Sequence, residues 1–251
     1  MIQNSMKGCV KLKKLWLLLV LILILLKNVV FAESDHMGFV ISPSIHGYKV
    51  AGTPDQYYTR NNRVWGNILD AENKPALEQE WLLEYLGNIE GCEDIILVID
   101  PEDELYGFFD TQSSFFCKPR FEDVSFSTRN EERLVAVSLD DYWGFCDRST
   151  GEIVIPCQYD GVFDDFTNGY ALVIMETDWE EDANEETLLL IDASGCEVRF
   201  PKGVTPFSVP NQAGYCIVMD DSSGLYGIGD VNGTIIMQPC EKKMPELKNM
   251  Y

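Results

Sequence analysis

Carboxylates are the most abundant side chains in this 251-residue chain that could take part in catalysis, with 41 Asp and Glu residues against two histidines. Such an excess makes acidic pairs such as Asp140-Asp141 unavoidable, so a pair alone does not indicate the two placed carboxylates of a hydrolase. His36 and His46 both stand near the N-terminus, and no nucleophile is spaced to use either of them as a base. We therefore expect no catalytic residue, and we keep a carboxylate-based hydrolase as the alternative.

Motifs that hold cofactors or metals are missing from the sequence. It has no phosphate-binding loop, no dinucleotide-binding glycine pattern and no metal-binding helix motif. Its cysteines form no CxxC pair that would indicate structural zinc. Asp220–Gly224 resembles a calcium loop only in composition, because the later bidentate Glu is not at the required spacing. We expect no cofactor and no metal.

The first 32 residues have the order of a secretory signal. Lysines precede the apolar run Leu15–Leu26, and Val30-Phe31-Ala32 then offers small residues for cleavage. The run is shorter than the roughly 20 apolar residues that a membrane-spanning helix needs. We predict a signal peptide at residues 1–32 and a mature protein that is extracellular or in the cell envelope. The alternative is an uncleaved anchor, in which residues 15–32 attach the protein to the membrane.

The predicted mature chain is strongly acidic. The full chain has a formal net charge of −22, and removal of five lysines with residues 1–32 makes it −22 − 5 = −27. This charge would repel nucleic acid and anionic membrane surfaces, so we exclude nucleic acid as a partner. It leaves two interpretations, a solvated repeat surface or an attraction for a cationic partner.

The cysteines do not define a disulfide framework. Cys9 lies in the predicted signal, and the remaining number is odd, so at least one thiol in an exported protein would stay unpaired or pair between molecules. Cys146 and Cys216 stand at strand positions, where we expect small buried apolar side chains rather than disulfides. The remaining cysteines are Cys92, Cys117, Cys157, Cys196 and Cys240.

One string of residues recurs along the chain and sets its architecture. Its fullest form runs from Trp143-Gly144 through a turn at Asp147 and Gly151 to a β-branched run that ends at Pro156, with a further strand at 170–174. A three-strand unit of this size cannot bury its own apolar face and needs neighbours. The recurring positions are Trp65, Gly66, Asp70, Tyr106, Gly107, Asp110, Trp143, Gly144, Asp147, Gly151, Pro156, Tyr159, Asp192, Gly195, Tyr226, Gly227, Asp230 and Gly233.

The spacing of the turn aspartates predicts the fold class. They stand at 70, 110, 147, 192 and 230, and an acidic insertion at 175–187 accounts for the longest step. We predict an all-β protein of tandem β-meander repeats of about 38–45 residues. The strings resemble the WG-repeat family of bacterial exported proteins, which is named for the Trp-Gly pair. The resemblance implies a β-repeat protein and carries over no catalytic residue.

The predicted organisation is a signal at 1–32, an N-terminal segment at 33–63 with a lone strand near 45–50, repeats at 64–241 and a tail at 242–251. Residues 75–86 fit either a short helix or a distorted strand. The repeats could close as a propeller-like ring of five units, in which residues 45–50 pair with 234–237, or form an open β-repeat array. The aromatic side chains of the Trp-Gly and Tyr-Gly pairs would either pack between units or form an exposed row that stacks sugars.

The absence of catalytic motifs from a repeat array favours a binding function. We predict a monomeric, non-enzymatic binding or scaffolding module, whose partner is an unknown protein or a cell-envelope polymer. The further alternative is an N-terminally anchored envelope protein with a structural role.

Overall fold

The computed structural model of the 251-residue chain describes residues 40–54, 63–85, 94–125, 133–176 and 186–247. The predicted signal peptide, His36, Cys9 and Cys92 lie outside the described residues. So does most of the acidic insertion. In the part of the chain that is described, no helix is long and apolar enough to cross a membrane.

The described chain is built from short antiparallel strands, as the repeat pattern predicts. The first sheet contains β1 (Val40–Ile41), β2 (Lys49–Pro54), β3 (Arg63–Leu69), β4 (Trp81–Tyr85), β5 (Ile95–Asp100), β6 (Leu105–Asp110) and β7 (Phe115–Phe121). The second contains β8 (Asp123–Ser125), β9 (Leu134–Leu139), β10 (Tyr142–Asp147) and β11 (Ile153–Tyr159). The third contains β12 (Gly161–Thr167), β13 (Tyr170–Glu176) and β14 (Glu186–Asp192), and the fourth contains β15 (Val204–Pro206), β16 (Tyr215–Asp220), β17 (Leu225–Asp230) and β18 (Ile235–Glu241).

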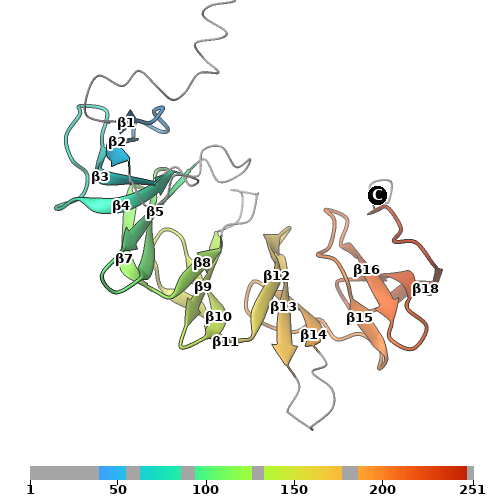
Figure 1. Ribbon diagram of the computed structural model, residues 1–251. Coiled ribbons are helices and arrows are strands. Elements are labelled where there is room, and N and C mark those ends of the chain that lie inside the picture. Colours follow the sequence, from blue (N-terminus) through green and yellow to red (C-terminus); the bar gives the residue numbers. More distant parts are fainter. Residues whose placement is uncertain (1–39, 55–62, 86–93, 126–132, 177–185, 248–251) are drawn as a thin grey trace, which may run out of the picture.

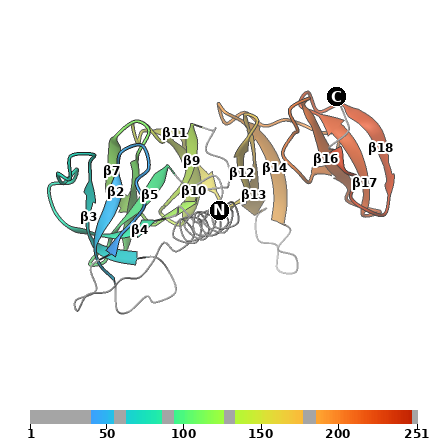
Figure 2. The same cartoon turned by 90° about the horizontal axis from the view of Figure 1, so that it is seen from above.

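Five structural units follow one another along the chain. Unit 1 is β1–β4, unit 2 is β5–β7, unit 3 is β8–β11, unit 4 is β12–β14 and unit 5 is β15–β18. Units 1 and 2 form one continuous sheet, because β4 pairs with β5 through Leu82↔Ile99 and Leu83↔Val98. The units form a curved row with unit 1 at one end and unit 5 at the other (Figures 1 and 2).

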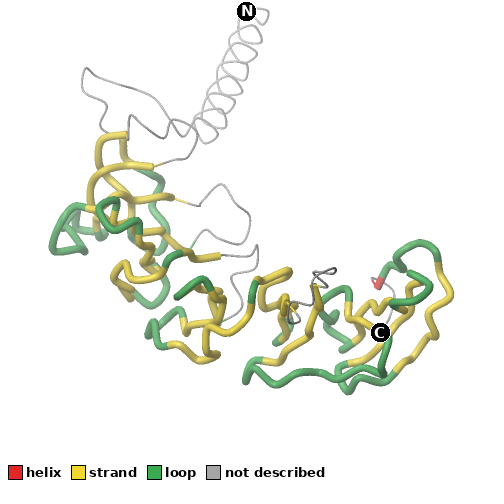
Figure 3. The backbone as a smooth tube through the Cα atoms, turned by 60° about the horizontal axis from the view of Figure 1, so that its bottom comes forward, coloured by secondary structure: helices red, strands yellow, loops and turns green. Residues whose placement is uncertain are grey.

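The row is an open array. Ring closure would require residues 45–50 to pair with 234–237, but β2 pairs with β1 and β3, and β18 pairs with β17. The backbone trace likewise keeps the two ends of the described chain apart (Figure 3). Of the two alternatives drawn from the sequence, the ring is therefore wrong and the open β-repeat array is confirmed. The helix considered for 75–86 is also wrong, since this segment ends in strand β4.

The sheets are out of phase with the sequence repeat. The last strand of one sequence copy pairs with the first strand of the next, as β9 does with β10, β13 with β14 and β16 with β17. The lone N-terminal strand predicted near 45–50 overlaps β2 only at Lys49 and Val50, because residues 45–48 form the turn before it. Strand β2 pairs with the Trp-Gly strand β3 of its own unit. It therefore belongs to unit 1 and does not complete a distant unit.

The glycine of the Trp-Gly pair makes room for a bulged neighbouring strand. Trp143 pairs with Tyr159 and Phe145 pairs with Ile155, so three residues of β11, including Pro156, lie opposite the single residue Gly144. A Cβ on Gly144 would lie 2.6 Å from the Ile155 carbonyl oxygen, which is too close for any side chain. The same crowding occurs at Gly107 and Gly227.

The fourth sequence copy shows what happens without that glycine. It has Leu188-Leu189 in place of the Trp-Gly pair, and its first strand, β14, has no regular outer partner in the described chain. The segment beyond the turn makes an isolated bridge from Ile191 to Glu197 and a hydrogen bond from the Val198 amide to the Leu190 carbonyl. Loss of the glycine thus coincides with loss of the bulged strand.

The hydrophobic cores are shared between neighbouring units. One core lies between units 2 and 3 and includes Phe108, Phe121 and Val137. The next joins units 3 and 4 through Phe145 and Phe166, whose ring centroids are 4.7 Å apart. A further core is shared by units 1 and 2, and another lies between units 4 and 5. Each unit therefore buries its apolar face against its neighbours, which makes the array mechanically continuous.

Candidate functional site: a polar pocket between units 1 and 2

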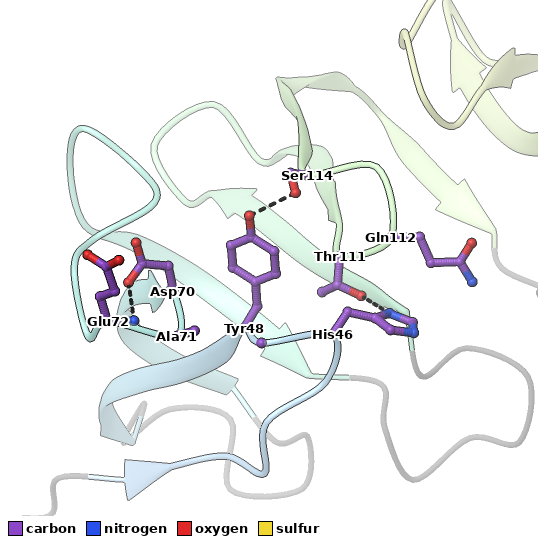
Figure 4. Close-up of a pocket in the computed structure, with 9 residues that line it drawn as sticks. His46, Tyr48, Asp70, Ala71, Glu72, Thr111, Gln112 and Ser114 are labelled. Atoms are coloured by element: carbon purple, nitrogen blue, oxygen red, sulfur yellow. Dashed lines mark hydrogen bonds between the residues drawn. The ribbon is translucent and has the colours of Figure 1, made fainter.

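The turns at one end of units 1 and 2 enclose a pocket of about 440 Å³ (Figure 4). They are the turn before β2, the turn after β3 and the turn after β6. The pocket is polar, because turns supply hydroxyl, amide and carboxylate groups while the apolar residues lie in the strands behind. Its lining residues are His46, Gly47, Tyr48, Asp70, Ala71, Glu72, Thr111, Gln112 and Ser114.

Tyr48 occupies the middle of the pocket. Its hydroxyl donates to Ser114 Oγ at 2.8 Å, which links units 1 and 2 across the pocket. The other edge of its ring contacts the core, where its centroid lies 4.9 Å from that of Phe109 in an edge-to-face arrangement. The tyrosine is therefore held at both ends and presents a fixed aromatic surface.

The Asp70 carboxylate is fixed by the backbone of its own turn. Its Oδ1 accepts hydrogen bonds from the amides of Glu72 at 2.8 Å and Lys74 at 2.9 Å. Glu72 Oε2 in turn lies 2.6 Å from the exposed ammonium of Lys74. Within the described residues, no basic side chain pairs with Asp70 itself.

A buried network of charged groups lies behind the pocket. Arg148, from the turn of unit 3, donates from Nε and Nη2 to the two carboxylate oxygens of Asp110 at 2.7 and 3.1 Å. Its Nη2 also lies 3.9 Å from Asp94 Oδ2. His46 Nδ1 lies 3.3 Å from Asp94 Oδ1 and 3.2 Å from Thr111 Oγ1, so the pocket and the network meet at this imidazole.

The five turn aspartates of the sequence pattern make the same type of contact. In each, Oδ1 accepts the backbone amide of the residue two positions ahead, at 2.8 or 2.9 Å. Burial opposes ionisation of Asp147, but hydrogen bonds from Ser149 and the guanidinium of Arg133 hold its pKa below the ordinary value. Of these five residues, Asp70 alone lines the pocket.

The aromatic residues of the repeat motif do not form one exposed row. Trp65 is exposed, with 43% of its surface accessible. Tyr106 and Trp143 are half-buried and pack against the cores of units 2 to 4. Tyr226 lies 5.5 Å from the ring of Phe207. The packing role that the sequence suggested describes Tyr106, Trp143 and Tyr226 better than it describes Trp65.

The remaining motif residues have structural surroundings. Gly151, Gly195 and Gly233 have positive φ values of 70°, 80° and 76° in the turns after β10, β14 and β17. Gly66 packs against the backbone of Gly52 in β2, and Tyr159 is buried in the core between units 3 and 4. Asp140 and Asp141 also have positive φ values, 54° and 66°, and form the two-residue turn between β9 and β10.

The described cysteines are all free thiols. Burial raises the pKa of Cys146 well above its ordinary value, and it raises the pKa of Cys216 to about 12. Both therefore behave as the small buried apolar side chains that their strand positions predict. In the described ranges no group of three or more His, Cys, Asp or Glu side chains is arranged to hold a metal ion.

The sequence predicts the turns that build this site but not most of the side chains that line it. The repeat pattern predicts Asp70 as a turn residue, but it assigns no role to His46, Thr111, Gln112 or Arg148. A signal was present, because the residue after each turn aspartate is Ala71, Thr111, Arg148, Ala193 or Val231. A charged arginine among small and apolar residues marks a position with a long-range partner.

One comparison with known protein families agrees with the repeat assignment in the third sequence copy. Residues 143–176 match the family model described as "WG containing repeat". No curated protein matches the chain. A solved structure of Kluyveromyces lactis Hsv2 has 13% identity, with a TM-score of 0.34 over 76% of this chain and 59% of that chain. Kuenenia stuttgartiensis hydrazine synthase has 11% identity, with a TM-score of 0.30 over 80% of each chain. This chain thus spans 59% of the Hsv2 chain that it matches.

Proposed function

Because residues 143–176 match the WG containing repeat, we propose that the chain is a non-enzymatic binding module for a protein or cell-envelope polymer, exported through its first 32 residues. The observation that carries this proposal is the polar pocket between units 1 and 2, which is built by turns of both units. A continuous array with shared cores keeps such a pocket in a fixed shape. A preformed site of this kind loses little conformational entropy when a ligand binds.

The carboxylates of the pocket support binding better than hydrolysis. A hydrolase of the carboxylate type needs one protonated and one ionised group on opposite sides of the bond to be cleaved. Here Asp70 Oδ1 is occupied by two backbone amides, and Glu72 pairs with the ammonium of Lys74. Both groups are therefore engaged in contacts that hold the shape of the turn.

The charge of the chain favours a cationic partner. A net charge of −22 produces a negative field that attracts cations and increases their local concentration at the surface. Such attraction depends on ionic strength, because about 0.15 M salt screens charges over roughly 8 Å.

Site-specific crosslinking in the cells that make the protein would test this function. A photoreactive amino acid at Ala71 places the reactive group in the pocket wall, and Ala193 is the matched control at the same position of the fourth turn. We expect a discrete adduct from position 71 that position 193 does not give. Identical patterns from both positions, or none from either, would contradict the proposal.

Export is tested separately on the same cells. Cleavage after Ala32 predicts a mature protein whose N-terminal residue is Glu33, found in the envelope or medium. Intact mass and N-terminal sequencing of the purified protein measure this directly. Recovery of the full-length chain from the cell interior would contradict export.

A further inference from the structure

We propose that the pocket between units 1 and 2 binds a guanidinium group, as carried by an arginine side chain of a basic peptide. This inference rests on the proposed binding function and specifies the chemical class of the ligand. It follows from the repeat itself, because the equivalent place between units 2 and 3 is filled by the guanidinium of Arg148.

The two places correspond at their turn aspartates. Asp110 ends β6 and pairs with Ile95, and Asp70 directly follows β3, whose last residue Leu69 pairs with Lys49. Asp70 and Asp110 are thus the same turn residue in successive units. The residue after the turn aspartate of the following unit is Arg148 for Asp110, which it contacts, and Thr111 for Asp70, with which it shares the pocket lining on the other side of Tyr48 (Figure 4).

The residue after the turn aspartate differs in length between the two places. Arg148 is long enough to reach across to the preceding unit, where it bonds both oxygens of Asp110 and approaches Asp94. Thr111 is short, and its hydroxyl donates to the Asp94 carbonyl of its own unit at 2.8 Å. Between units 1 and 2 the short Thr111 stands in place of this arginine, and a pocket is present with Asp70 and Thr111 in its lining.

A second turn aspartate shows the same preference. Asp147 is paired through Oδ2 with the guanidinium of Arg133. Two consecutive members of the repeat, Asp110 and Asp147, thus take an arginine from within the chain. Asp70 precedes both, and no basic side chain pairs with it within the described residues.

The rest of the lining suits a planar cation with several N–H donors. Tyr48 presents a fixed aromatic ring, and Ser114 Oγ, which accepts from the Tyr48 hydroxyl, stands beside it as an acceptor (Figure 4). Guanidinium stacks on aromatic rings and donates in a fork that matches a carboxylate, whereas an ammonium group does so less well. Among the lining residues, His46 is the only side chain that can carry a positive charge. Its Nδ1 is directed to Asp94 and Thr111.

Peptide titration of the processed protein would test this inference by NMR. The probe is acetyl-Gly-Arg-Gly-amide, compared with the same peptide carrying citrulline, which has the shape of arginine without its charge, or lysine. We expect the arginine peptide to bind at the pocket, the lysine peptide to bind more weakly and the citrulline peptide not to bind. Equal affinity for arginine and citrulline would overturn the proposal.

Two protein variants locate the contact. Asp70→Asn keeps the oxygen that accepts the turn amides but removes the charge, so we expect about tenfold or greater loss of affinity for the arginine peptide. Asp192→Asn makes the same change in the fourth turn and should leave affinity unchanged. Thr111→Arg supplies an internal guanidinium and should abolish peptide binding in a folded protein.

The outcomes separate this inference from the function on which it rests. Unchanged affinity in Asp70→Asn, or peptide binding retained in Thr111→Arg, would refute guanidinium recognition. Adducts that remain specific to position 71 would then still identify a binding module, with a ligand of another class. If the arginine peptide does not bind and the adducts specific to position 71 are also absent, the proposed binding function is refuted as well.

Discussion

Arg148 and Asp110 form a two-point ion pair that joins unit 3 to unit 2, and both side chains are almost fully buried. Buried pairs of this kind gain little over an apolar pair, but a single partner left behind is expensive because its charge stays without compensation. The stability of the junction between units 2 and 3 therefore depends on one side chain, that of Arg148.

Replacing Arg148 should therefore destabilise the array strongly. We expect Arg148→Ala to lower the free energy of unfolding by about 3–5 kcal/mol, because it leaves Asp110 and Asp94 buried near one another. Urea denaturation followed by tryptophan fluorescence measures the change. The control is Arg199→Ala, which removes an arginine that is 85% exposed and pairs with Glu197 at 3.4 Å. A similar small effect, below about 0.5 kcal/mol, in both variants would contradict the structural role.

The glycine of the Trp-Gly pair should not tolerate even a methyl group. In Gly144→Ala the new Cβ would lie 2.6 Å from a backbone oxygen and 2.7 Å from a backbone nitrogen of β11, so a strand must shift. We expect a loss of about 1–3 kcal/mol in the free energy of unfolding. Gly161→Ala is the matched control, because its Cβ would meet the flexible end of Ile174 at 3.0 Å. Equal losses in the two variants would show that crowding against the bulge is not the cause.

The turn aspartates should make the fold sensitive to acid. The Ser194 hydroxyl and nearby backbone amides hold the pKa of Asp192 below its ordinary value. A carboxyl whose pKa is lower in the folded than in the unfolded state contributes stability above the unfolded pKa and loses it as the pH falls through the folded one. Ser194→Ala should raise the pKa of Asp192 toward the ordinary value and weaken the acid dependence.

Carbon NMR titration of the Asp side chains measures that effect. The resonance of Asp230 serves as the internal reference, because its hydrogen bonds come from Asn232 and Thr234 and are untouched by the substitution. An unchanged Asp192 titration in Ser194→Ala would contradict the assigned cause.

Thiol reactivity should divide the cysteines by burial. Cys196 and Cys240 are exposed and should react with a maleimide at pH 7 in the native protein. Cys146 and Cys216 should react only after unfolding, because burial hides the sulfur and keeps the thiolate unpopulated until the pH approaches about 12 for Cys216. Mass spectrometry of the labelled peptides reads out each site. Rapid native labelling of Cys216 would show that unit 5 opens readily.

Local signals in the sequence were sufficient to predict the turns and the short strands of the repeat. Asp147, Gly151 and their equivalents mark turns because their side chains or backbone angles are required there, whatever surrounds them. The phase of the sheets was not predictable in this way. Tyr159 ends β11 and Gly161 begins β12 of the next sheet, and nothing in so short a stretch indicates that pairing stops between them.

The candidate site depends on contacts between residues far apart in sequence. Tyr48 meets Ser114, and Arg148 meets Asp110, only because the units stack in one order and orientation. A single sequence shows that Thr111 is short and that Arg148 is long. It does not show which aspartate each one faces, and so the pocket could not be placed before the fold was known.

The proline-containing bulges have a consequence for solubility. β7, β11 and β18 each lie at the free margin of a sheet, and they carry Pro119, Pro156 and Pro239. A proline offers no N–H to an incoming strand, and a bulge bends the margin away from the straight line that a second molecule would need. The same irregularity that requires glycine in the adjacent strand thus guards these margins against strand-by-strand polymerisation with other copies of the chain.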